Sequence, residues 1–230
     1  MERQRHIDSS LRDLKDLLIG MGGHVERAIE HATQALIGMD QSKLHYVYES
    51  EKRINEAHIR VDEDCLRILA TQQPMAVDLR LIVSVLKINT DLERMGDQAV
   101  NIAQNGARYL TGQPLRQFVN IARISSDVKS MVRESLDAFV TQDEKKATQV
   151  LERDDKVDAL KAKIFQEVMA HLKTHPADIE AGVTLILIAR NLERIGDHAT
   201  NIAEDVIFSI TGRDVRHTPR DPAKVSKPVG

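Results

Sequence analysis

The chain has 230 residues and a formal net charge of −3 at pH 7, so it lacks the bulk positive field that nucleic-acid binding requires. A hydrophobic content of 42% suits a globular protein, and a single cysteine, Cys65, excludes an internal disulfide or a cysteine-based zinc site. No stretch reaches the roughly 20 apolar residues of a membrane span, and none reads as a signal peptide; we therefore expect a cytoplasmic protein that reaches a membrane only through a partner.

The composition favours helices over strands. Aromatic residues make up 3% of the chain, whereas strong helix formers such as Leu, Ala, Glu, Lys, Arg and Gln are abundant. Apolar residues recur every three or four positions, and proline or glycine interrupts the pattern at Pro74, Gly112, Pro176 and Gly212. We predict helices at 7–38, 42–70, 75–110, 115–141, 143–173 and 178–210.

The predicted helices require an antiparallel arrangement. Helices of about 30 residues are about 45 Å long, and the turns between them span only a few residues. Residues 213–230 hold three prolines and several charges, so we predict that this tail is disordered.

An internal duplication defines the organisation of the chain. Residues 92–103 (LERMGDQAVNIA) match residues 192–203 (LERIGDHATNIA), with nine of twelve positions identical. A weaker match, shifted by 103 positions, relates residues 49–55 to residues 152–158. The sequence therefore predicts an all-α fold of two tandem pseudo-symmetric three-helix bundles, at 1–112 and 113–212, followed by the tail.

The repeated motif places oxygen-bearing side chains along one side of a helix in each half. These residues lie at i, i+4 and i+8, and they are Glu93, Asp97 and Asn101 in the first half and Glu193, Asp197 and Asn201 in the second. Carboxylates four residues apart repel each other, so their presence in both halves favours a role that offsets this cost. The alternative is a solvated face, with intrahelical ion pairs to Arg94 and Arg194 and with Gly96 and Gly196 allowing close helix approach.

In each half, a second stripe of oxygen-bearing side chains lies on the preceding predicted helix. In the second half Asp154 and Asp158 are also four residues apart, and in the first half Glu51 and Asn55 take their places. Carboxylate and amide oxygens suit Mg²⁺, Mn²⁺, Ca²⁺ or iron. Two facing stripes predict a site for metal ions in each half, weaker in the first because Asn55 replaces a carboxylate.

Other histidine and cysteine patterns do not indicate catalysis. No glutamate has a histidine three residues later, which di-iron bundle enzymes require. His198 corresponds to Gln98 in the repeat, so it is not a repeated ligand. His171 precedes a helix end and is expected to have a capping or surface role, and Cys65 falls on the apolar stripe of its helix.

The doubled motif, together with residues 72–80 (QQPMAVDLR), resembles the PhoU family of bacterial phosphate-uptake regulators. The resemblance covers about residues 7–212. It implies two similar three-helix bundles, a cytoplasmic location, frequent homodimers, and surface metal clusters held by pairs such as Glu93 with Asp97 and Glu193 with Asp197. The expected cofactors are divalent or iron ions (Mg, Mn, Fe or Zn).

The resemblance also implies a function without catalysis by the chain itself. The family represses the phosphate-starvation response by contacting the ATPase subunit of the phosphate ABC transporter and the phosphate-sensing histidine kinase. Two other interpretations stay open at this point. One is a metal-dependent hydrolase that uses the carboxylate stripes to activate water, and the other is a purely structural helical scaffold.

Overall fold

The structure is a computed structural model that describes residues 2–115 and 120–216. Within these ranges the chain forms helices and no strand, which confirms the predicted all-α class. The elements are α1 (Glu2–Gly38), the short 3₁₀ helix η1 (Gln41–Leu44), α2 (His45–Gln72), α3 (Val77–Thr111), α4 (Asn120–Thr141), α5 (Glu144–Thr174), the 3₁₀ turn η2 (Pro176–Asp178) and α6 (Ile179–Thr211).

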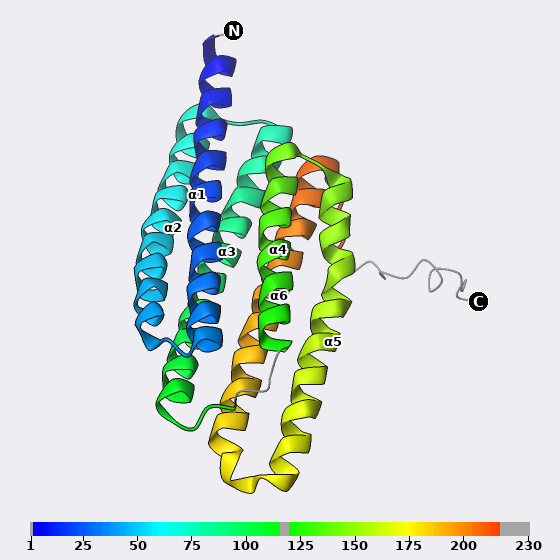
Figure 1. Cartoon of the computed structure of the whole chain (residues 1–230). Helices are drawn as coiled ribbons and strands as arrows, with labels where there is room; N and C mark the ends of the chain where they lie inside the picture. Colours follow the sequence, from blue (N-terminus) through cyan, green and yellow to red (C-terminus); the bar gives the residue numbers. More distant parts are fainter. Residues whose placement is uncertain (1, 116–119, 217–230) are drawn as a thin grey trace, which may run out of the picture.

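The six helices form two three-helix units that lie side by side (Figure 1). Helices α1, α2 and α3 pack on one another, as do α4, α5 and α6, while α3 packs along α6 and α1 along α4 between the units. Each of these two cross-unit contacts joins a helix to its own repeat counterpart. This pairing of counterpart helices is expected when a pseudo-twofold axis relates the two units, as the sequence predicted.

The buried apolar side chains of both units form one continuous core. The predicted stripes are confirmed: Leu18, Met21 and Val25 of α1 and Ile54 and Cys65 of α2 are all buried. Burial raises the pKa of the Cys65 thiol to about 12, so this cysteine is a packing residue rather than a nucleophile. The predicted division between 1–112 and 113–212 falls in the segment between α3 and α4, and it stays a prediction because the core runs through both units.

Several helix boundaries differ from the predicted ones because turns take up residues next to them. Helix α2 begins at His45 rather than 42, since Asp40 caps the η1 turn by accepting a hydrogen bond from the Ser42 amide. Helix α3 begins at Val77 rather than 75, after Gln73 and Ala76 with positive φ angles of 48° and 44°. Helix α4 begins at Asn120, and residues 116–119, which were predicted to be helical, lie outside the described residues.

The predicted disordered tail is only partly described. Residues 217–230 lie outside the described residues. Val215 packs against the core, and Arg216 forms an ion pair with Asp214. The first few residues of this segment therefore belong to the folded structure.

Polar contacts accompany apolar packing between α1 and α4. The hydroxyls of Thr33 and Ser125 form a buried hydrogen bond across the two helices. Glu26 pairs with Arg133 at 2.7 Å at the edge of the same contact. These contacts fix the register of the two units along their length.

We predict that Ile88→Ala in α3 destabilises the whole chain. Ile88 is fully buried, and removing such a side chain leaves a cavity that costs about 2–5 kcal/mol of unfolding free energy. Leu66→Ala is the control, because Leu66 is 64% exposed and should cost no more than about 0.5 kcal/mol. Urea unfolding followed by circular dichroism measures both, and equal losses would contradict the assigned core.

Candidate metal-binding site

Four carboxylates converge between α5 and α6 in the second unit. Asp154 and Asp158 come from α5, and Glu193 and Asp197 come from α6. The charges of the other three carboxylates all act on Asp197. The four carboxylates that the sequence predicted for this unit are thus near enough for their charges to act on Asp197, and we call them the second-unit carboxylate cluster.

The pKa of Asp197 reflects the electrostatic environment of this cluster. Its pKa is raised from 3.8 to about 6, first by partial burial of the carboxyl and then by the negative charges of Glu193, Asp154 and Asp158. Burial and the neighbouring negative charges both disfavour the ionised form of this carboxyl. Such a site gains from any cation that enters it.

A positively charged side chain, that of Lys161, already contacts these carboxylates, and the sequence analysis did not predict it. The Lys161 ammonium on α5 donates to Asp158 Oδ1 at 2.9 Å and also to Glu193 Oε1. These contacts raise the pKa of Lys161, mainly through the hydrogen bond to Glu193. Lys161 lies one turn after Asp158, which is the signal that could have pointed to it.

The corresponding residues of the first unit are arranged differently. On α2 the Asn55 amide donates to Glu51 Oε1 at 2.5 Å, so the asparagine is occupied by its own stripe. On α3 Glu93 is half-buried and Asp97 is exposed, as are their counterparts Glu193 and Asp197 on α6. The position 103 residues before Lys161 is His58, whose Nε2 lies 3.6 Å from Asp62 Oδ2.

The repeated glycines allow the two stripes of each unit to approach closely. A Cβ added to Gly96 on α3 would lie 3.1 Å from the Ile54 side chain on α2. A Cβ on Gly196 would lie 3.4 Å from Val157 on α5. The alternative reading of these glycines as packing residues is thereby supported, and the close approach also sets the distance between the carboxylate stripes.

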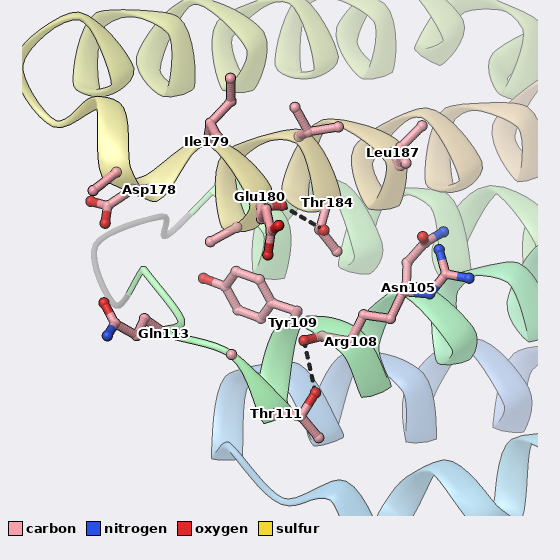
Figure 2. A pocket seen from close by; sticks show the side chains of 14 residues that line it. Asn105, Arg108, Tyr109, Thr111, Gln113, Asp178, Ile179, Glu180, Thr184 and Leu187 are labelled. Atoms are coloured by element: carbon pink, nitrogen blue, oxygen red, sulfur yellow. Dashed lines mark hydrogen bonds between the residues drawn. The ribbon is translucent and has the colours of Figure 1, made fainter.

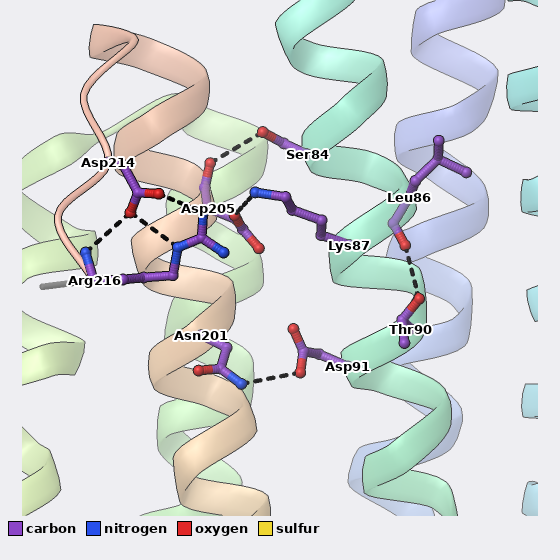
Figure 3. A network of polar contacts seen from close by, with 9 residues as sticks. All are labelled: Ser84, Leu86, Lys87, Thr90, Asp91, Asn201, Asp205, Asp214 and Arg216. Carbon is purple, nitrogen blue, oxygen red and sulfur yellow. Dashed lines mark hydrogen bonds and ion pairs between the residues drawn. The ribbon is translucent and has the colours of Figure 1, made fainter.

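The side chain of the asparagine that ends the α6 stripe contacts the other unit, whereas the contact given by Asn101 on α3 is through its backbone carbonyl. The Asn201 side-chain amide donates to Asp91 Oδ1 on α3 at 3.2 Å, across the contact between the units (Figure 3). The Asn101 carbonyl accepts a hydrogen bond from the Asn105 side chain at 2.8 Å. Asn201 is therefore engaged away from the second-unit carboxylate cluster, and the role of both asparagines as metal ligands stays a prediction.

A polar network between α3 and α6 was also missed by sequence reasoning. Asp91 accepts from His198 Nδ1 at 2.8 Å, and buried Asp205 pairs with the Lys87 ammonium at 2.9 Å. The Ser84 hydroxyl donates to the Asp205 carbonyl, as Figure 3 shows. None of the partners is adjacent in sequence, so only the packing of α3 on α6 reveals them.

The predicted ligands do not form a closed metal cage. Over residues 2–115 and 120–216, no three His, Cys, Asp or Glu side chains are placed to enclose one metal ion. The donors themselves suit a hard cation, because they are carboxylate oxygens with a surplus of negative charge. Ligation in the second unit would require the Lys161 ammonium to move away from Asp158 and Glu193.

A hollow at one end of α3 and α6 lies away from these stripes. It has a volume of about 960 Å³ between the end of α3 and the start of α6, where Tyr109 lies near Glu180 and Arg108 extends toward Asn105 (Figure 2). Ile179 and Val183 on its α6 wall are about half exposed. None of the predicted metal ligands lines it.

Comparison with known proteins identifies the family to which this arrangement of helices belongs. A family model described as the PhoU domain matches residues 18–106 and again residues 121–206. The chain belongs to the PhoU family. The two matches correspond to the two units of the repeat.

Similar proteins share nearly the whole length of the chain. The phosphate-specific transport system accessory protein PhoU homolog of Pseudomonas aeruginosa is 40% identical over 214 residues, which cover 93% of this chain and 88% of that protein. The PhoU accessory protein of Serratia marcescens is 31% identical over the same shares of both chains. Neither name describes an enzyme, in agreement with the prediction of a non-catalytic protein.

Two crystal structures of the PhoU family share the fold. That of PhoU from Pseudomonas aeruginosa has a TM-score of 0.86 at 39% identity and covers 90% of this chain and 99% of its own. That of the phosphate transport system regulatory protein PhoU from Streptococcus pneumoniae has a TM-score of 0.84 at 26% identity, with coverage of 91% and 99%.

We predict that Asp197 makes metal-free stability depend on pH. The folded carboxyl, with a pKa of about 6 against an ordinary 3.8, binds its proton more tightly than the unfolded one. Its contribution to stability is thus greatest at low pH and is lost as pH rises through 6. Asp197→Asn should remove this fall, so its stability relative to wild type should rise between pH 4 and 6 and level off above.

Urea unfolding in EDTA at several pH values measures this difference. The neighbouring carboxylates supply part of the effect, so 0.5 M salt should reduce it. A difference between variant and wild type that is constant from pH 4 to 7 would contradict the assigned environment of Asp197.

Proposed function

We propose that this protein is a negative regulator of phosphate uptake and of the phosphate-starvation response. Membership of the PhoU family carries the proposal, because relatives that match almost the full chain are named accessory or regulatory proteins of phosphate transport. We further propose that it works in the cytoplasm, as a homodimer, and joins the ATPase subunit of the phosphate ABC transporter to the phosphate-sensing histidine kinase.

The shape of the molecule supports an adaptor role. None of the described helices is long and apolar enough to cross a membrane, so contact with a membrane transporter would be made through a protein partner. Two related units offer two long helical faces, on which separate partners can bind together. Exposed apolar side chains such as Ile179 and Val183 occur on one of these faces, and such surfaces commonly mediate protein contacts.

Metal binding by the carboxylate stripes is part of the proposal. Glu193, Asp197, Asp154 and Asp158 would hold a Mg, Mn, Fe or Zn ion in the second unit. In the first unit Glu93 and Asp97, opposite Glu51 and Asn55, would hold a more weakly bound ion. A bound cation would supply charge compensation for the cluster, and the protein's own residues would position it on a surface that partners contact.

We predict that Lys161→Gln strengthens metal binding. The Lys161 ammonium contacts Asp158 and Glu193, so it competes with a metal ion for the same oxygens, and its removal should raise the affinity for Mn²⁺ several-fold. Lys163→Gln is the matched control, because Lys163 lies on the same helix and is 61% exposed. Asp197→Ala should lose more metal than Asn55→Ala. Equal Mn²⁺ affinity in all four variants and wild type, measured by titration calorimetry, would contradict the site.

Deleting the protein should leave the phosphate-starvation genes on in phosphate-rich medium. A folded variant with Glu93, Asp97, Glu193 and Asp197 all replaced by alanine should behave like the deletion if metal is required. Reporter expression measures repression, and circular dichroism checks that the variant folds. Normal repression by the quadruple variant would refute the role of metal alone, whereas normal repression in the deletion strain would refute the regulatory role.

A further inference from the structure

A hollow between α1 and α2 gathers basic side chains. It has a volume of about 470 Å³ and contains His24, Arg27 and His31 from α1 and Lys52 and Arg53 from α2. Tyr46 closes one end, where its ring lies 5.0 Å from that of His31. We call these five basic residues the basic hollow, and it lies outside the carboxylate stripes.

The positive charge of this hollow is only partly paired, through a contact of Arg53 with Glu56 at 3.1 Å. Arg27 and Lys52 have no carboxylate within 4 Å among the described residues. One carboxylate, Glu49, also lines the hollow and lies 3.2 Å from His45. The pKa of His24 is lowered by burial and then by the charges of Arg27 and Arg53, while the charge of Glu56 opposes the shift. The two arginines thus outweigh Glu56 at His24, in a chain whose net charge is −3.

The repeat provides an internal comparison for this hollow. Val25, Ala28 and Ile29 of α1 are buried, and so are Val128, Met131 and Val132 of α4, 103 positions later. The same shift relates the paired stripes of α2 and α5. The positions that correspond to His24, Arg27, His31, Ser50 and Lys52 are therefore Asp127, Ser130, Glu134, Arg153 and Asp155, while Arg53 corresponds to Lys156, which is also basic.

In the second unit these positions neutralise one another. Arg153 reaches across from α5 to Glu134 at 2.6 Å and to the Ser130 hydroxyl at 3.1 Å. Asp127 lies 3.7 Å from the same guanidinium. In the first unit Ser50 stands where Arg153 would be, and its short side chain bonds back to the Tyr46 carbonyl at 2.9 Å. The same groove is thus filled and paired in one unit but hollow and basic in the other.

We propose that the basic hollow binds an oxyanion of the phosphate class. Arginine and imidazole N–H groups form charge-assisted hydrogen bonds with phosphate oxygens, and Arg27, Arg53 and His24 offer such donors from two helices. A volume of 470 Å³ is suited to a small molecule, since such sites span about 300–1,000 Å³. The proposal does not depend on the regulatory role, because it rests on the α1–α2 groove alone.

The neighbouring part of the groove restricts where the anion can lie. Beyond His24 and Arg53 the groove continues into a second hollow that contains Asp13, Asp16 and Asp64. An anion is repelled from that end and attracted to the end near Tyr46. This separation of charge along one groove favours a compact phosphate or diphosphate group over a long anionic chain.

Titration calorimetry in EDTA and low salt tests the proposal with orthophosphate, pyrophosphate and ATP. The informative variant is Arg27→Ser with Lys52→Asp, which places in the first unit the residues of the second. Both positions are exposed, so folding should be kept. Loss of two charge-assisted contacts should weaken binding at least about tenfold.

A matched control changes the net charge by the same amount elsewhere. Arg123→Ser with Lys156→Asp alters exposed residues of α4 and α5 and should bind the anions like wild type. Vesicles of phosphatidylcholine with and without phosphatidylglycerol distinguish a lipid headgroup from a free phosphate. The site is supported if the first variant loses binding and the control variant keeps it. The probe that binds most tightly then identifies the source of the phosphate group. Absence of binding to every probe, or equal binding by both variants, would overturn the proposal.

Discussion

The packing of α3 along α6 is the contact on which the rest of the structure depends. Each helix carries one copy of the repeated motif, and their apolar faces meet in the centre of a core shared by both units. Buried charges in this contact are paired, as Asp91 is with His198 and Asp205 with Lys87, because an unpaired buried charge would be strongly destabilising. With these faces turned inward, the carboxylates of the motif lie outside the shared core, where Glu193 contacts Lys161 of α5.

Duplication followed by divergence explains why the two units differ chemically within one architecture. Apolar positions agree between the halves because both must fill the same kind of core. Polar positions between the outer helices are under no such constraint. Thus His58 and Lys161 are counterparts beside the two stripes, and Ser50 and Arg153 are counterparts in the outer groove. The carboxylate cluster with its lysine belongs to the second unit, and the open basic groove belongs to the first.

Part of the candidate site was predictable and part was not. The stripes of α5 and α6 were predictable because carboxylates four residues apart share a helix face, and identity between the halves marked the α6 stripe. Lys161 and the turn of Asn201 toward Asp91 were not. A lysine's long side chain can reach several partners, and which one it meets depends on the neighbouring helix. The second-unit carboxylate cluster therefore differs from its sequence pattern in two ways: a lysine contacts it, and Asn201 contacts Asp91 instead.

The sequence by itself determined the helices, their antiparallel order, the duplication and the family, because periodicity, turn residues and repeated motifs are local properties of the chain. Only the tertiary structure decided how the units share a core, which buried charges pair across α3 and α6, and which grooves are filled or hollow. These outcomes depend on side chains about 100 residues apart in sequence, such as Asp91 with His198. The spatial distance between such side chains is set by helix packing, which local sequence patterns do not indicate.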